Sequence, residues 1–285
     1  MPNNVSDFEF MFITSLIGFL ILFFVFFNEL FRIDKSHIIQ SLILSVEIFA
    51  FNFFLLLGVG AVDTTVVSSV LSSYFIFIPI IEYIVFKTLP KKNIIIAILL
   101  SLIGVFMILE LKAKNFINKN ILFLLISDIA MASYVITTGN FAKNSNPAIL
   151  SMGQLLFVTI FAFIGWYIEV MIKGLSFRLP KEPLFWGSII FIGFFIRGMY
   201  TVIQVYAQRY VPPINTSLIF ASEIVMTLFF SNYISKYFGY LKKDEFITPI
   251  KILGALMMVL GILVCDDNFY DFLLKKIKIK NENKI

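Results

Sequence analysis

Long uninterrupted runs of apolar residues make up most of the chain, and short polar or proline-bearing stretches separate them. A helix that spans a bilayer needs roughly 20 mostly apolar residues. The runs lack the alternating polarity of membrane β-strands, and helices satisfy their own backbone hydrogen bonds in lipid. The pattern predicts an all-α polytopic membrane protein with nine spanning segments: Phe10–Phe27, Ile38–Gly60, Thr64–Phe86, Asn93–Leu109, Ile121–Ala142, Ala148–Ile168, Leu184–Ala207, Ile214–Ser235 and Thr248–Cys265.

The composition agrees with a membrane protein and excludes several other classes. Of 285 residues, 59% are hydrophobic and 14% are charged, and the mean hydropathy is +0.93. A soluble domain carries about 25% charged residues, so we expect no soluble nucleic-acid binder. One cysteine and one histidine cannot build a disulfide framework or a Cys/His metal cage. We therefore expect no metal site and no cofactor.

The basic residues predict how the chain crosses the membrane. Through Lys92, the basic residues all fall on one side of the predicted bilayer, at Arg32, Lys35, Lys87, Lys91 and Lys92. Lys and Arg are enriched in cytoplasmic loops. We therefore expect a multi-pass plasma-membrane protein with its N-terminus outside and its C-terminus in the cytoplasm. The lysine-rich tail, residues 269–285, predicts either an anchor that faces lipid headgroups or a plain solvated tail.

Two apolar segments far apart in the chain resemble each other. Residues 93–109 and 250–264 each follow a lysine-bearing loop, and Gly104 corresponds to Gly261 as Ala97 corresponds to Gly254. Small residues seven apart lie on one helix face and allow close packing. A weak internal repeat in a polytopic membrane protein is typical of transporters, whose binding site lies between the repeats.

The order of several motifs resembles the EamA-like branch of the drug/metabolite transporter superfamily. The similarity covers nearly the whole chain and rests on these stretches: Gly58–Gly60, Phe77–Pro79 and Gly104–Val105 in the first half, and Asn120–Asn146, Val205–Tyr210, Thr216–Glu223, Glu245–Pro249, Gly254 and Gly261 in the second. The resemblance implies two repeats, at residues 1–111 and 118–268. It also implies transport of small polar metabolites such as amino acids.

The chain departs from that family in helix number. The family has five helices in each half and an inverted-repeat fold, whereas four segments precede Leu111 here and five follow it. The first segment resembles the family's second helix, so either the opening helix is missing or the true start lies upstream. Glu223 matches a family glutamate that proline usually follows, but Ile224 follows here. A missing helix leaves a homodimer as an alternative to a monomeric carrier.

A polar stripe runs along the seventh segment. Arg197, Thr201, Gln204 and Gln208 are spaced to share one helix face, and such a face turns toward the bundle interior. A charge at the bilayer centre costs about 2.5–3.5 kcal/mol on insertion scales, so Arg197 needs a partner or a wet cavity. Glu223 lies mid-way along the next segment. The two charges predict either a substrate or proton site or an ion pair that pins two helices together.

Other polar residues in the apolar segments complete the predicted site. We expect Glu47, Asn52 and Tyr134 to line the same cavity, with snorkelling to the headgroups as the alternative for Glu47. For Asp128 we expect a structural or capping role, and for Gln154 a hydrogen bond between helices.

These residues favour a secondary-active transporter of a small polar solute, amino-acid-like or drug-like. The two repeats would alternate access to a central cavity. A phosphate-binding loop of the Gly-x-x-x-x-Gly-Lys-Ser/Thr type is absent from the sequence, so energy would come from a proton gradient or from exchange, with Glu223 as the first choice for the proton. The alternatives are a membrane assembly subunit that does not transport and, with least support, an intramembrane enzyme.

Overall fold

The computed structural model describes residues 6–59, 73–109, 119–173, 183–223 and 248–282, with seven single positions between these ranges. Regular structure in these residues is helical, in agreement with the all-α prediction. Five helices are long and apolar enough to span a membrane, and a sixth candidate is a pair bent by 102°, Pro249–Cys265 with Asp267–Leu273. The helices divide between two compact units, each built from segments that are distant in the sequence.

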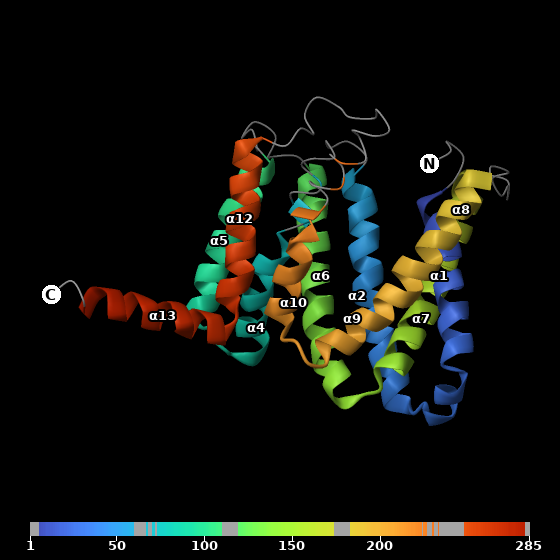
Figure 1. Cartoon of the computed structure of the whole chain (residues 1–285). Coiled ribbons are helices and arrows are strands. Elements are labelled where there is room, and N and C mark those ends of the chain that lie inside the picture. Colours follow the sequence, from blue (N-terminus) through green and yellow to red (C-terminus); the bar gives the residue numbers. More distant parts are fainter. Residues whose placement is uncertain are drawn as a thin grey trace. The chain divides into compact units, whose positions relative to one another are not determined.

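The first unit takes the chain up to Leu56 and then from Tyr134 to Pro212. Its helices are α1 (Asp7–Val25), η1 (Phe27–Arg32), most of α2 (Lys35–Val59), the end of α6 (Lys119–Asn144), α7 (Pro147–Lys173), α8 (Pro183–Phe191), η4 (Ile192–Tyr200) and α9 (Thr201–Gln208). Figure 1 labels the α-helices among them.

Local sequence explains where two helices of this unit begin. Ser6 caps α1 by accepting a hydrogen bond from the backbone N–H of Phe8, and the Asn146 side chain accepts from the N–H of Ala148 at the start of α7. Pro147 then opens α7, at a position where its missing N–H costs nothing. The two helices pack together through a cluster that includes Leu22, Met152 and Leu155.

The stretch from Pro183 to Gln208 is a continuous helix with an irregular middle. Its central part, η4, is a π-helix and carries Arg197. Helix α1 lies against it: a Cβ added to Gly18 would lie 2.8 Å from the Cβ of Arg197, and one added to Gly193 would lie 2.8 Å from the Cβ of Ile17. Glycine at both positions therefore permits the close approach of α1 to the base of Arg197.

The second unit takes residues 57–133 and 213–285. Its described helices are the start of α6, η2 (Tyr74–Ile76), α4 (Phe77–Phe86), α5 (Lys92–Leu109), α10 (Pro213–Ala221), α12 (Pro249–Cys265) and α13 (Asp267–Glu282).

Two of the predicted membrane-spanning segments differ from the helices of this unit. The segment Thr64–Phe86 is not one regular helix, because a turn at Ser73 and the 3₁₀ turn η2 interrupt it. Pro79 lacks the N–H that would bond the carbonyl of Phe75, which explains the break. The segment Ile214–Ser235 is helical to Ala221, and much of its remainder lies outside the described residues.

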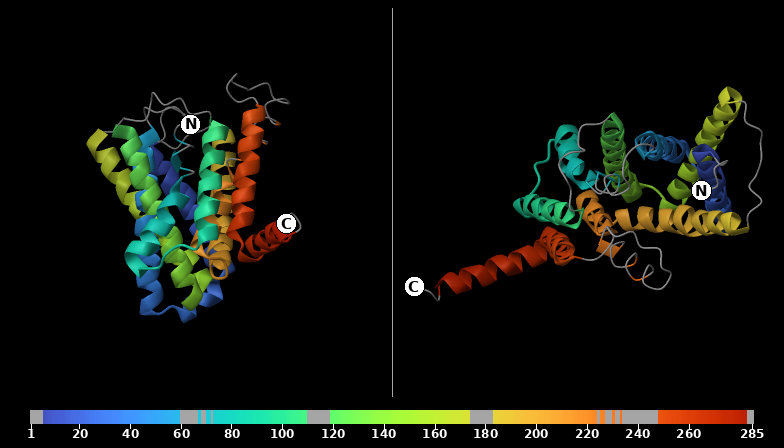
Figure 2. Two further views of the ribbon diagram at one scale, coloured as in Figure 1. Left: turned by 90° about the vertical axis from the view of Figure 1, so that its left-hand side faces the viewer. Right: turned by 90° about the horizontal axis from the view of Figure 1, so that it is seen from above.

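Helices α5 and α12 pack closely along their small residues, and Figures 1 and 2 show them side by side. A Cβ added to Gly104 would lie 2.6 Å from the carbonyl oxygen of Gly254, and one added to Gly261 would lie 2.8 Å from that of Ala97. The contacts run in opposite order along the two helices, so the helices are antiparallel. Gly104 therefore contacts Gly254, and Ala97 contacts Gly261. Because Gly104 aligns with Gly261 in the repeat and Ala97 aligns with Gly254, this is the pattern of a contact with two-fold symmetry.

A bend of 102° after α12 turns α13 away from the end of that helix, as Figures 1 and 2 show. The Asp266 side chain caps α13 by accepting from the N–H of Phe269 at 2.9 Å. Asp267 pairs with Lys91 at 2.5 Å and accepts from Asn93 Nδ2 at 2.8 Å. Asn93 Nδ2 also lies 3.2 Å from the carbonyl oxygen of Cys265. The start of α5 and the corner between α12 and α13 are thereby joined by polar contacts. The lysine-rich tail predicted for residues 269–285 is therefore mostly helical, because α13 covers residues 267–282.

Candidate functional site

Six of the seven predicted site residues lie in the first compact unit, on helices α2, α6, η4 and α9. Glu47 and Asn52 are half-buried on α2, and Tyr134 is buried on α6. Arg197 is half-buried, whereas Gln204 and Gln208 are buried. Polar side chains that the sequence spreads over 160 residues are therefore held within one compact body.

Arg197 and Asn52 contact each other. Nη2 of Arg197 lies 3.5 Å from Oδ1 of Asn52, which is at the long limit for a hydrogen bond. The Asn52 amide is oriented by its Nδ2, which donates to the carbonyl oxygen of Ile48 at 2.6 Å. This orientation turns the acceptor oxygen of Asn52 toward the guanidinium. The long contact leaves the guanidinium able to exchange Asn52 for a stronger acceptor, such as a carboxylate.

Glu47 contacts the next helix of the cluster. Its Oε1 accepts a hydrogen bond from the Thr137 hydroxyl at 2.9 Å, so α2 and α6 meet through a carboxylate and a hydroxyl. Tyr134 lies one turn earlier on α6, close enough to Glu47 and Arg197 for their charges to influence its hydroxyl group. The cluster therefore combines a cation, a carboxylate, an amide and a phenol. Snorkelling of Glu47 to the headgroups is not needed to explain its position.

A further layer reaches α7. The Tyr134 hydroxyl donates to Oε1 of Gln154 at 3.3 Å, and the Ser45 hydroxyl lies 3.1 Å from the carbonyl oxygen of Gln154. Gln154 thus forms the interhelical hydrogen bond expected of it. Thr137 is a member of the cluster that the sequence did not single out, because a threonine is inexpensive in an apolar helix and gives little signal.

Gln204 and Gln208 differ from the rest of the cluster. Gln208 is fully buried and Gln204 is 5% exposed. Among the described residues, Nε2 of Gln204 and both polar atoms of the Gln208 amide have no hydrogen-bond partner. A buried amide without a partner costs about 1–3 kcal/mol. These amides can donate to and accept from a polar molecule or water that enters the unit.

Glu223 stands apart from the other six. It belongs to the second compact unit, and its side chain is exposed. The proposed bridge between Arg197 and Glu223 would join the two units, and it stays a prediction. The polar cluster of the first unit accounts for Arg197 without it.

The sequence matches one known protein family over nearly its whole length. The sequence pattern of the EamA-like transporter family matches residues 1–110 and 118–265, nearly the whole chain in two segments. The chain belongs to the EamA-like transporter family. As an EamA-like protein it is a membrane transporter of the drug/metabolite type, as the resemblance implied, and its multiple apolar helices agree.

The fold of this EamA-like transporter also matches a solved structure. A chain titled only "Crystal structure of protein" aligns with a TM-score of 0.72 and 12% sequence identity, over 95% of this chain and 90% of that chain. At this identity the likeness shows the fold alone. A search of curated proteins gave no match.

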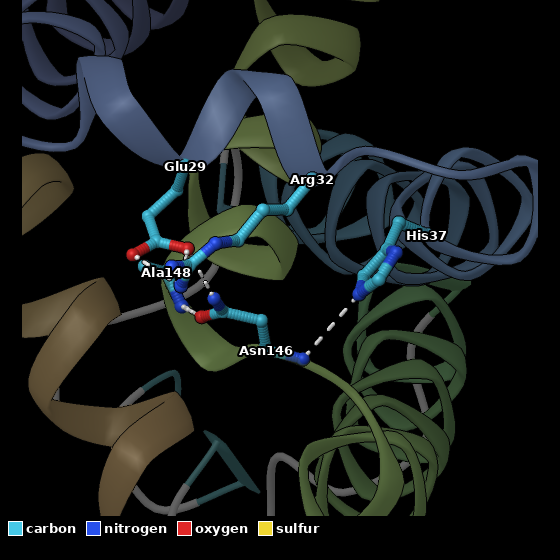
Figure 3. A network of polar contacts seen from close by, with 5 residues as sticks. All are labelled: Glu29, Arg32, His37, Asn146 and Ala148. Atoms are coloured by element: carbon cyan, nitrogen blue, oxygen red, sulfur yellow. Dashed lines mark hydrogen bonds and ion pairs between the residues drawn. The ribbon is translucent and has the colours of Figure 1, made fainter.

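The EamA-like transporter also has a polar network at one end of its first unit, which Figure 3 shows. Glu29 pairs with Arg32 at 3.2 Å and accepts from Asn146 Nδ2 at 2.8 Å. His37 Nε2 lies 3.4 Å from the backbone N of Asn146, and His37 Nδ1 lies 2.7 Å from Asp34 Oδ1. The backbone N–H of His37 also donates to Asp34, which lowers the pKa of that carboxyl. The network fixes η1 and the start of α2 to the start of α7.

Two more features of the described residues bear on the site. A cavity of about 320 Å³ lies beside that network and is lined almost entirely by apolar side chains, with His37 and Ser41 as exceptions, so it does not suit a polar solute. No group of three or more His, Cys, Asp or Glu residues that could hold a metal ion occurs in the part of the chain that the structure describes.

Proposed function

We propose that this EamA-like protein is a secondary-active transporter of a small polar solute, and that the polar cluster of the first unit binds it. The observation that carries the proposal is that Glu47, Asn52, Tyr134 and Arg197 converge from three helices whose other residues are mostly apolar. Polar and charged groups in membrane helices are costly and mark solute or ion pathways.

The chemistry of the cluster favours a zwitterion, such as an amino acid. The Arg197 guanidinium can bind a carboxylate in a bidentate manner, and the Glu47 carboxylate can accept from an ammonium group. The amides of Gln204 and Gln208 supply donors and an acceptor without partners among the described residues. A solute with both charges would replace the weak Asn52 contact and satisfy the buried amides.

The transport mechanism that we propose is alternating access, driven by a proton gradient or by exchange. The exposed carboxylate of Glu223 is the coupling group that the sequence predicts. Glu223→Gln should then abolish gradient-driven transport and leave folding and membrane insertion intact. Wild-type flux in that variant would remove Glu223 from the mechanism.

The binding proposal is tested with purified protein in proteoliposomes and a mixture of labelled zwitterionic amino acids. Arg197→Ala should raise the half-saturating concentration at least tenfold, because the carboxylate loses its cation. Arg209→Ala is the matched control, since Arg209 is an exposed arginine at the end of the same helix. If Arg197→Ala lowers only thermal stability, Arg197 has a structural role. If the wild type moves no amino acid, the chain transports another solute class or is an accessory subunit.

We further propose that the protein lies in the plasma membrane with its N-terminus outside. Water-borne thiol labelling tests the wet cavity, in a Cys265→Ser background that keeps a hydrogen-bonding group beside Asn215. Cysteines placed at Arg197, Gln204 and Glu223 should label in at least one transport state. If all three stay unreactive in every state, the proposed site is not a solute pathway.

A further inference from the structure

A carboxyl group that the proposed solute site does not use is buried in the second unit. Asp128 lies nine residues after the start of α6, so it does not cap that helix, and its side chain is fully buried. Its Oδ2 lies 3.0 Å from the Ser73 hydroxyl. Its Oδ1 has no hydrogen-bond partner among the described residues, and Asp128 is in none of the three ion pairs found there.

Counting protons on Ser73 shows what this contact requires. The Ser73 hydroxyl also lies 2.7 Å from the carbonyl oxygen of Val70, and a hydroxyl has one proton to donate. When Ser73 donates to Val70, the contact with Asp128 is a hydrogen bond only if Asp128 carries a proton and donates it. A neutral Asp128 therefore allows both contacts of the Ser73 hydroxyl, with Val70 and with Asp128, to be hydrogen bonds at the same time.

The Ser73 hydroxyl can also form a hydrogen bond with Asp128 when the carboxyl is ionised. The carbonyl oxygen of Val70 already accepts from the backbone N–H of Ser73 at 2.8 Å, so the Ser73 hydroxyl can rotate away from it and donate to Asp128. One hydroxyl rotation therefore follows the loss of the proton. The ionised state still leaves a buried charge with a single neutral donor, which is strongly unfavourable without water.

Few of the described residues in the helices packed on η2 are titratable. Helices α4 and α10 pack on η2, which follows Ser73. Helix α10 has no titratable residue, α4 carries Glu82 and Tyr83, and η2 carries Tyr74. On the described part of the chain, the side chain shown to interact with Asp128 is Ser73. Within the described residues, therefore, no cation is shown to interact with Asp128 and hold it ionised.

We propose that Asp128 and Ser73 form the proton-binding site that couples transport. Asp128 binds the proton while its carboxyl is buried, as it is in this structure, and it releases the proton when a transport state brings water to the carboxyl. Asp128 precedes Tyr134, one of the proposed solute-binding residues, by six positions in the sequence of α6. This inference rests on the proposed transport function, and it adds a buried proton-binding carboxyl to the exposed Glu223.

Infrared titration of the purified full chain tests proton binding without any solute. The wild type should show the carbonyl band of a protonated carboxyl at neutral pH, and the band should vanish at alkaline pH. Asp128→Asn should lack this band, whereas Glu82→Gln, which alters a half-buried carboxyl on α4, should keep it. Identical spectra for the wild type and Asp128→Asn would overturn the proposal.

Proteoliposome assays with the labelled amino-acid mixture then test coupling. Asparagine has the shape of the neutral acid, so Asp128→Asn should keep amino-acid exchange within about twofold of the wild type and lose accumulation driven by a pH gradient. Accumulation equal to the wild type would refute a coupling role. If Asp128→Asn is inactive in exchange as well, Ser73→Ala, which removes only the hydroxyl, must reduce gradient-driven accumulation more than exchange, or the proposal fails. A wild type without exchange refutes the proposed solute class, while the infrared result still decides proton binding.

Discussion

The close contact between α5 and α12 gives a stability prediction whose size follows from the structure. In Gly104→Ala, the new Cβ would lie 2.6 Å from the carbonyl oxygen of Gly254 and 2.9 Å from the backbone N of Met258. Backbone atoms cannot move aside as a flexible side chain can, so the two helices must separate. Overpacking of this kind costs about 1–3 kcal/mol, partly offset by the roughly 0.5–1 kcal/mol that alanine gains over glycine in a helix.

Gly187→Ala is the matched control. A Cβ at Gly187, also in a helix, meets no atom within 4 Å, so this variant has the helical gain without the clash. The difference between the two variants isolates the overpacking, and we expect Gly104→Ala to be about 1–3 kcal/mol less stable than Gly187→Ala. Unfolding by SDS in mixed micelles, followed by circular dichroism, measures both free energies.

A double variant sharpens the same test. A Cβ at Gly254 would meet the carbonyl oxygen of Gly104 at 2.7 Å, so either alanine alone forces the same separation of α5 from α12. Gly104→Ala with Gly254→Ala should therefore cost less than the sum of the single changes. Equal stability of Gly104→Ala and Gly187→Ala would refute the close packing of these helices, and strict additivity would refute the shared separation.

Three further predictions concern other contacts. Gly18→Ala should lower the affinity for the solute in the flux assay, because its Cβ would press on Arg197; an unchanged half-saturating concentration would contradict this. Asp34 has a lowered pKa in the folded state. The ionised carboxylate therefore stabilises the start of α2 above the ordinary pKa of aspartate, and this stabilisation is lost as the pH falls through the lowered pKa. Asp34→Ala should speed hydrogen exchange at the His37 amide at neutral pH but not at a pH below the lowered pKa. The pKa of Asp267 is likewise lowered, chiefly by its hydrogen bond from Lys91, so Lys91→Ala should speed tryptic cleavage in α13 at low salt, and high salt should reduce the difference because the pair is exposed.

The sequence predicts much of the fold because lipid makes simple demands. Apolar runs such as residues 38–59 and 148–168 become helices, since no other structure of that length satisfies its backbone hydrogen bonds in a bilayer. Close helix packing is predicted from four small residues, Ala97, Gly104, Gly254 and Gly261. In the structure they form an antiparallel contact, Gly104 with Gly254 and Ala97 with Gly261. Polar residues in these runs predict the candidate site in the same way, because each is too costly to face lipid.

Other features depend on contacts that a single sequence does not display. The π-helical turn around Arg197 comes without a proline, in a stretch that reads as ordinary helix. The contact of Asp128 with Ser73 joins residues 55 positions apart, and their segments carry no signal of pairing. The compact units also do not follow the repeats, because each unit takes helices from both matched segments. Repeats arise from duplication of sequence, whereas compact units arise from which helix faces pack together.

The division into compact units predicts which helices of the transporter move together. If α5 and α12 move together, as members of one compact unit, a covalent link between them should be tolerated. Ser101→Cys with Gly261→Cys suits such a link, because a Cβ at Gly261 would overlap the Ser101 hydroxyl, so the two Cβ atoms come close enough to be joined through a disulfide. In a Cys265→Ser background, the oxidised protein should transport within about twofold of the reduced protein. Loss of transport on oxidation that a reductant restores would show that α5 and α12 must separate during the cycle, and would exclude the second unit as a rigid body.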